Sequence, residues 1–114
     1  MFFIKLQLLR LQDLETHVFN KLEEELPKNL YFHNTDYAKH IYHHAGILAK
    51  SENLDSEETL LVRTAALLMQ LGYTETYETA VQKSAAIASD ILTKFQYSEN
   101  QTDIIRNLIL SAQW

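Results

Sequence analysis

Residues 56–71 form a segment that is apolar around most of its circumference when it is drawn as an α-helix. Its apolar residues are Leu60, Leu61, Val62, Ala65, Ala66, Leu67, Leu68 and Met69. A helix that is apolar on nearly every side has to be surrounded by other elements. The sequence therefore predicts that this segment is the central helix of a bundle, and we expect Gly72 to end it.

Four other segments show helical spacing. The first runs from Ile4 to Leu26 with an apolar residue at about every turn, and Pro27 stops it. The second is expected from a cap at Asn34 or Thr35 to about residue 51, with an apolar face made by Ala38, Ile41, Tyr42, Ala45, Leu48 and Ala49. We expect a fourth helix over about residues 77–95 and a fifth that opens at residues 98–101.

Two short sequences have the pattern of a capping box. Asp55 is followed three residues later by Glu58, and Ser98 is followed by Gln101. In such a box each side chain hydrogen-bonds to the backbone N–H of the other residue, which satisfies donors at the start of a helix. These boxes place the starts of the third and fifth helices.

The fold class follows from these patterns and from the scarcity of turn formers. The 114 residues include only two Gly and one Pro, which disfavours a turn-rich β-fold. We predict an all-α fold, a compact bundle of about five helices, in one domain that covers residues 1–114. The alternation at the start of the chain leaves a short strand over residues 2–8 open as an alternative.

Composition excludes several classes of function. The formal net charge is −5 and the basic residues are dispersed, so we expect neither a nucleic acid nor an anionic membrane as a partner. No apolar run approaches the length of a membrane span, and the amino terminus is interrupted by charged residues, unlike a signal peptide. There is no Cys to form a disulfide or a thiolate metal site. We expect a cytoplasmic protein.

Three segments, taken in this order, resemble the HD-domain superfamily of metal-dependent phosphohydrolases. They are residues 26–34 (LPKNLYFHN), 65–77 (AALLMQLGYTETY) and 84–92 (SAAIASDIL). The resemblance covers roughly residues 15–114 and implies an HD-like helical bundle. In that family, histidines and aspartates hold a divalent metal ion, among them a His-Asp pair at the end of the central helix. The ion makes a bound water acidic enough to attack phosphorus.

This chain departs from the family pattern at each metal position. Tyr37 stands where the resemblance requires the first histidine, Met69 and Gln70 stand at the His-Asp pair, and Ala80 stands at a later histidine. The final Asp would lie beyond the end of the chain. A neutral phenol, a soft thioether and an amide are poor ligands for the cations of hydrolases. We therefore predict no family-type metal site, no cofactor and no catalytic residue.

The resemblance implies a remnant of the pocket that these positions would line. Its predicted members are His33, Asn34, Tyr37, Met69, Gln70, Thr74 and Glu75. Local roles compete with this interpretation, since Asn34 can cap the second helix and Thr76 can cap the fourth. A divalent metal held by unrecognised ligands is the alternative, and His40 and His44, four residues apart on one helix, are its best candidates together with His33.

The start of the chain has more apolar residues than one helix face needs. Phe2, Phe3, Leu6 and Leu9 flank the apolar stripe of the first helix. Such an excess is typical of a contact with another chain. We expect residues 1–14 to be either an extra helix or a dimerisation segment of a homodimer, and Trp114 could serve in the same way.

Three functions remain open from the sequence. The first is a catalytically inactive HD-like domain that acts as a binding, regulatory or protein-interaction module, with a small phosphorylated or nucleotide ligand. The second is a phosphohydrolase for nucleotides or phosphomonoesters with atypical metal ligands. The third is a dimerisation domain without a ligand pocket. Fold alone cannot choose among them.

Overall fold

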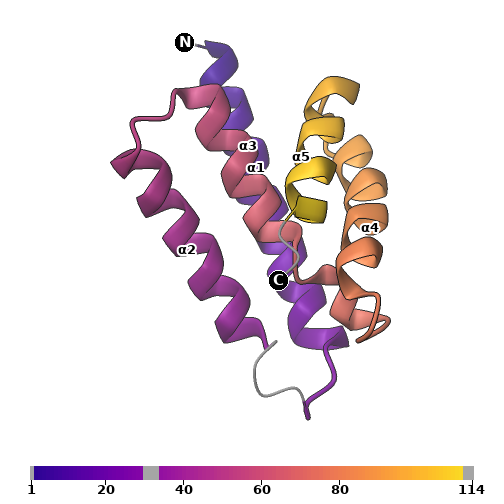
Figure 1. The fold of residues 1–114 in the computed structure, drawn as a ribbon. Helices are drawn as coiled ribbons and strands as arrows, with labels where there is room; N and C mark the ends of the chain where they lie inside the picture. The colour runs from indigo at the N-terminus through magenta and orange to yellow at the C-terminus, as the bar shows by residue number, and fades with distance from the viewer. Residues whose placement is uncertain (1, 30–33, 112–114) are drawn as a thin grey trace.

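Helix α3 (Ser56–Leu68) lies in the middle of the molecule, as its apolar composition predicts (Figure 1). The computed structural model describes residues 2–29 and 34–111, and their side chains from residue 10 onward. Within that part, α3 packs against α1, α2, α4 and α5. Seven of its side chains are buried, namely Leu60, Leu61, Thr64, Ala65, Ala66, Leu67 and Leu68.

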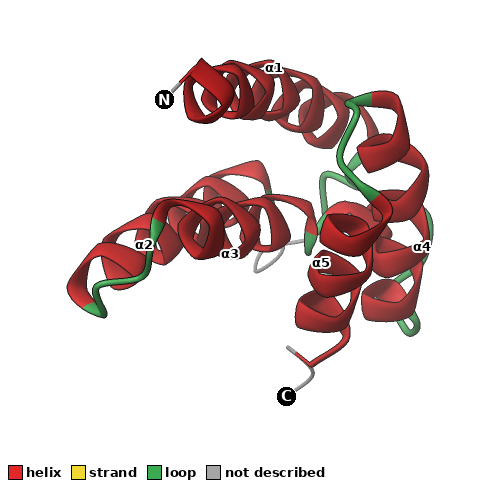
Figure 2. Cartoon of the chain, turned by 90° about the horizontal axis from the view of Figure 1, so that it is seen from above, coloured by secondary structure: helices red, strands yellow, loops and turns green. Residues whose placement is uncertain are grey.

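The described residues contain five α-helices, one short 3₁₀ helix and no strand, which confirms the predicted all-α bundle. The helices other than α3 are α1 (Phe2–Glu25), α2 (Thr35–Ser51), α4 (Ala80–Lys94) and α5 (Glu99–Ser111). Seen from above, they form two pairs, α2 with α3 and α4 with α5, and α1 runs along one side of the α2–α3 pair (Figure 2). The alternative of a strand over residues 2–8 is wrong, because this segment belongs to α1.

The helix starts follow the local signals in the sequence. Asn34 caps α2, and its side-chain oxygen accepts a hydrogen bond of 2.8 Å from the Tyr37 N–H. Asp55 and Glu58 make the reciprocal bonds of a capping box at α3. Ser98 and Gln101 make the same pair of bonds at 3.0 and 2.9 Å before α5. These caps satisfy backbone donors that the first helical turn leaves unpaired.

Two predicted helix bounds are wrong. Helix α3 ends at Leu68 instead of residue 71, and a 3₁₀ helix, η1 (Leu71–Thr74), follows it. Helix α4 starts at Ala80, and its cap position is Thr79 without a side-chain cap bond, so Thr76 does not cap it. Gly72 has no left-handed backbone conformation. It is required instead by packing, because a Cβ at this position would lie 2.8 Å from the Ser84 backbone nitrogen of α4 and overlap the Ala80 carbonyl.

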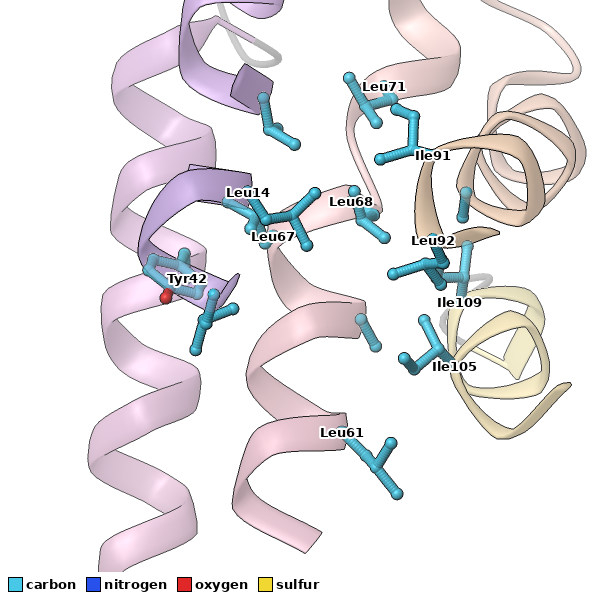
Figure 3. Packing of buried hydrophobic residues seen from close by; sticks show 14 of the residues in the cluster. Leu14, Tyr42, Leu61, Leu67, Leu68, Leu71, Ile91, Leu92, Ile105 and Ile109 are labelled. Carbon is cyan, nitrogen blue, oxygen red and sulfur yellow. The ribbon is translucent and has the colours of Figure 1, made fainter. Parts of the chain in front are cut away.

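The core joins all the helices. Leu14 of α1 lies beside Leu67 of α3, and Leu92 of α4 lies beside Ile105 and Ile109 of α5 (Figure 3). The predicted apolar face of α2 is only partly correct, since Leu48 is 60% exposed while Ala38, Tyr42 and Ala49 are buried. Helix α2 therefore meets α3 with a narrower face than its sequence suggests.

Some predictions fall on parts of the chain outside this description. The backbone of residues 2–9 is helical, but the side chains of Phe2, Phe3, Leu6 and Leu9 lie outside the described residues, as do His33 and Trp114. The homodimer through this segment stays a prediction. Among the described helices, none has the length and apolarity needed to cross a lipid bilayer.

Candidate functional site

The turn between α3 and η1 holds the two residues at the predicted His-Asp position. Met69 follows the last residue of α3 and packs against the apolar core. With Val62, Ala65, Ala66, Leu108 and Ile109 it lines a small cavity of about 190 Å³ between α3 and α5. Met69 is half-buried and its neighbours in this open pocket are all apolar, a setting suited to packing and unsuited to a charged ion.

Gln70 lies next to Met69 and is 4% exposed. Its backbone carbonyl accepts a 3.1 Å hydrogen bond from the Tyr73 N–H, which starts η1. The buried side chain is a neutral amide, so it presents an oxygen and an NH₂ group but no negative charge. An Asp in its place would bring a carboxylate that burial disfavours unless a cation or several donors lie beside it.

Ser84 of α4 fixes the conformation of this turn. Its fully buried hydroxyl donates to the Met69 carbonyl at 2.8 Å and accepts from the Gly72 N–H at 2.7 Å. One side chain thereby satisfies a carbonyl left over at the end of α3 and a backbone donor of η1. Ser84 was not among the predicted site residues, because it meets the turn only through the tertiary fold and carries no local signal.

Two tyrosines in and after η1 lie together and a third, at the start of α2, acts electrostatically on one of them; we call Tyr37, Tyr73 and Tyr77 the tyrosine cluster. The rings of Tyr73 and Tyr77 lie edge to face, with centroids 5.6 Å apart. Burial raises the pKa of Tyr73 above its usual value, and the neighbouring Tyr77 and Tyr37 hydroxyls raise it further. Neutral hydroxyls and aromatic faces suit hydrogen bonding and stacking with a ligand.

Only Tyr37 of this cluster was predicted as a site residue. Tyr73 and Tyr77 were missed, although their spacing of four residues was a usable signal for two side chains on one side of a turn. Tyr37 is 40% exposed and stands in the first turn of α2, where the resemblance requires a histidine.

The other predicted pocket residues lie in different surroundings. Asn34 is occupied as the cap of α2. The Thr74 hydroxyl donates to the Leu71 carbonyl at 2.6 Å. Glu75 makes an ion pair of 3.4 Å with Lys83 and lines a cleft between α1 and α4. The predicted pocket residues thus do not line one shared pocket, since Met69 faces α5 and Glu75 faces α1 and α4.

The alternative metal ligands His40 and His44 do lie together. Their ring centroids are 4.3 Å apart, and both residues lie on the exposed side of α2. In the described part of the chain, no group of three or more His, Asp or Glu side chains is arranged to hold a metal ion. His33, the third candidate, lies outside the described residues.

Comparisons with protein-family models, with curated proteins and with solved structures found no match to this chain. The HD-like character is therefore still a prediction from the three sequence segments.

Proposed function

We propose that this chain is a degenerate HD-like domain that binds a ligand or a protein partner and does not hydrolyse phosphate esters. The proposal joins the sequence resemblance to the chemistry of the α3–η1 turn. It assigns the ancestral metal position to Met69 and Gln70 and leaves binding as the remaining role of the bundle.

The surroundings of Met69 are the observation that supports this proposal most strongly. At the position where the resemblance requires an imidazole, the side chain packs on the core and lines an apolar cavity beside α5. A metal-binding imidazole has to present a nitrogen to an ion that also accepts water. A side chain whose surroundings are aliphatic serves packing instead.

The tyrosine cluster supports the binding part of the proposal. Phenol hydroxyls hydrogen-bond to polar groups, and their rings stack on flat ligands at little entropic cost. Without a metal ion, such groups orient a molecule but do not lower the pKa of water. A small phosphorylated or nucleotide ligand, or a second copy of the chain, remains the proposed partner.

A second candidate function rests on the His40–His44 pair. Two imidazoles whose ring centroids lie 4.3 Å apart could share one ion and support a hydrolase with atypical ligands. Both stand on the exposed side of α2. This candidate predicts activity that is lost when either histidine is replaced.

The test is metal analysis of the purified full chain together with assays of phosphate release. We expect no stoichiometric divalent metal and no release of phosphate from nucleotides or phosphomonoesters when Mg²⁺ or Mn²⁺ is added. Stoichiometric metal together with turnover that His40→Asn or His44→Asn abolishes would establish the hydrolase instead. If there is no turnover, a ligand-induced rise in Tm separates a binding module from a dimerisation scaffold.

A further inference from the structure

A groove of about 500 Å³ opens between the second half of α2 and the first half of α3. Its volume falls within the range of small-molecule sites, about 300–1,000 Å³. None of its lining residues belongs to the α3–η1 turn or to the tyrosine cluster. We call it the α2–α3 groove.

The α2–α3 groove is lined by positive charge, although the chain as a whole is acidic. Lys50 and Arg63 line it together with His43, and among the described residues no Asp or Glu lines it. The whole chain has 15 acidic and only 10 basic residues. A groove lined by two cations and no acid therefore differs in charge from the rest of the surface. In the described part of the chain, no salt bridge involves Lys50 or Arg63. Glu15 of α1 acts on the Tyr42 hydroxyl, but it does not line the groove and makes no ion pair with Arg63 among the described residues. Both cations can therefore meet an anion from solution.

Arg63 is held in place by Tyr42. A guanidinium nitrogen donates to the Tyr42 hydroxyl at 3.0 Å, and the guanidinium carbon lies 5.1 Å from the centre of the Tyr42 ring. The two contacts order the long Arg side chain before any ligand arrives. Several of its N–H donors are still available for the oxygens of a ligand, because a guanidinium has more donors than this one bond uses.

The rest of the α2–α3 groove is largely apolar. Tyr42, Ile47 and Leu54 supply ring and aliphatic surface, and Ile47 is 51% exposed. Gly46 of α2 also lines the groove, and a Cβ at this position would lie 3.6 Å from the Arg63 Nε atom. The missing side chain therefore keeps open the space in front of the guanidinium.

We propose that the α2–α3 groove binds a small organic phosphate, with the phosphate at Lys50 and Arg63 and an apolar body against Ile47 and Leu54. A phosphate monoester carries about −1.5 to −2 charges at pH 7, which matches two permanent cations better than a carboxylate does. Arg binds its oxygens in a fork and Lys binds as a point charge. The apolar lining selects an ester over the free ion.

This inference deepens the proposed binding function, since it names a ligand class and a place, but it does not depend on the HD resemblance. It concerns residues of α2, α3 and their connection, none of which belongs to the Met69–Gln70 turn. A phosphate ester that is bound and hydrolysed would end the proposed function and leave the groove inference standing. A groove that binds nothing would end the groove inference and leave the proposed function standing.

The experiment titrates naphthyl phosphate into the full chain and follows backbone amide resonances by NMR. Three comparison probes are used. Naphthol tests the apolar body alone, inorganic phosphate tests the charged group alone, and naphthoate tests the same body with a single negative charge. We expect shifts centred on residues 43–50 and 59–63, and an affinity for naphthyl phosphate about tenfold higher than for any of the other three probes.

Three variants locate the ligand. Arg63→Met and Lys50→Met each remove one charge, and we expect about tenfold weaker binding from either. Gly46→Leu leaves both charges in place but fills the groove, and it should weaken binding as much. Lys94→Met is the matched control, because Lys94 is also the basic residue in the last turn of its helix, and it should leave affinity unchanged.

The inference is overturned by shifts that centre elsewhere, by naphthoate or phosphate binding as tightly as naphthyl phosphate, or by equal effects of Lys50→Met and Lys94→Met. Lys50 is exposed, so its variant folds even where loss of the Arg63–Tyr42 contact harms the other variant. Release of naphthol during the titration is measured in parallel and reports on hydrolysis alone.

Discussion

Gly72 and Ala80 approach each other so closely that a Cβ atom at Gly72 would overlap the carbonyl oxygen of Ala80. This contact brings η1 against the first turn of α4. The same approach places the Ser84 hydroxyl between the Met69 carbonyl and the Gly72 N–H. The geometry of the candidate site thus depends on a glycine that no backbone torsion demands.

Gly72→Ala should destabilise the fold strongly. The added methyl group meets backbone atoms of Ala80 and Ser84, which cannot rotate away as a side chain can, so we expect a loss of about 3 kcal/mol or more in the free energy of unfolding. Urea denaturation followed by circular dichroism measures it.

Gly46→Ala is the matched control for that variant. Gly46 is inside α2 with an ordinary helical backbone, and its Cβ would be in normal contact with Arg63 at 3.6 Å. Alanine loses less conformational entropy there, so stability should rise by about 0.5–1 kcal/mol. Equal effects of the two substitutions would contradict the packing described for Gly72.

Ser84→Ala should weaken the α3–η1 turn. The change leaves the Gly72 N–H and the Met69 carbonyl without the partner they share, and we expect a loss of about 2–4 kcal/mol. Ser89→Ala on the same helix removes only a 3.3 Å bond to the Ala85 carbonyl and should change stability by less than about 0.5 kcal/mol. A Ser84 variant as stable as the Ser89 variant would show that the turn does not need this hydroxyl.

Tyr42 should make the fold sensitive to alkaline pH. Burial is the largest effect and raises the pKa of Tyr42. The nearby Arg63 lowers this pKa and the Glu15 carboxylate raises it, so the net shift is upward. The unfolded phenol loses its proton near pH 10, whereas the folded one keeps it. The stability linked to Tyr42 is therefore fully present below about pH 10 and falls as pH rises above that value.

Urea midpoints measured at a series of pH values from about 8 to about 11 test this expectation. Tyr42→Phe has no proton to lose, so its midpoint should fall less steeply above pH 10 than that of the unaltered chain. Parallel curves for the two proteins would exclude Tyr42 as the source of the alkaline sensitivity.

Local signals in the sequence were sufficient for much of the fold. The Asp55–Glu58 and Ser98–Gln101 boxes depend on neighbours three residues apart, so their bonds could be predicted without tertiary structure. The central place of α3 followed from its apolar circumference, which no exposed helix would keep.

The features that were missed depend on contacts between distant segments. Gly72 was expected to end α3 as a helix cap, but its role comes from Ala80 and Ser84 on the next helix. Leu48 fits the apolar face of α2 on a helical wheel, yet α3 does not reach it. The α2–α3 groove could not be predicted, because Lys50 and Arg63 line one groove only after the two helices pair.

The most direct test of the proposed non-catalytic function is a titration of the chain with Mn²⁺, followed by paramagnetic broadening of backbone amide resonances. A metal ion at the position of the His-Asp pair would broaden the amides of residues 69–75 and of Tyr37 at one equivalent. Because Met69 packs against aliphatic side chains and Gln70 is neutral, we predict no selective broadening there. Selective, saturable loss of those resonances would contradict the proposal.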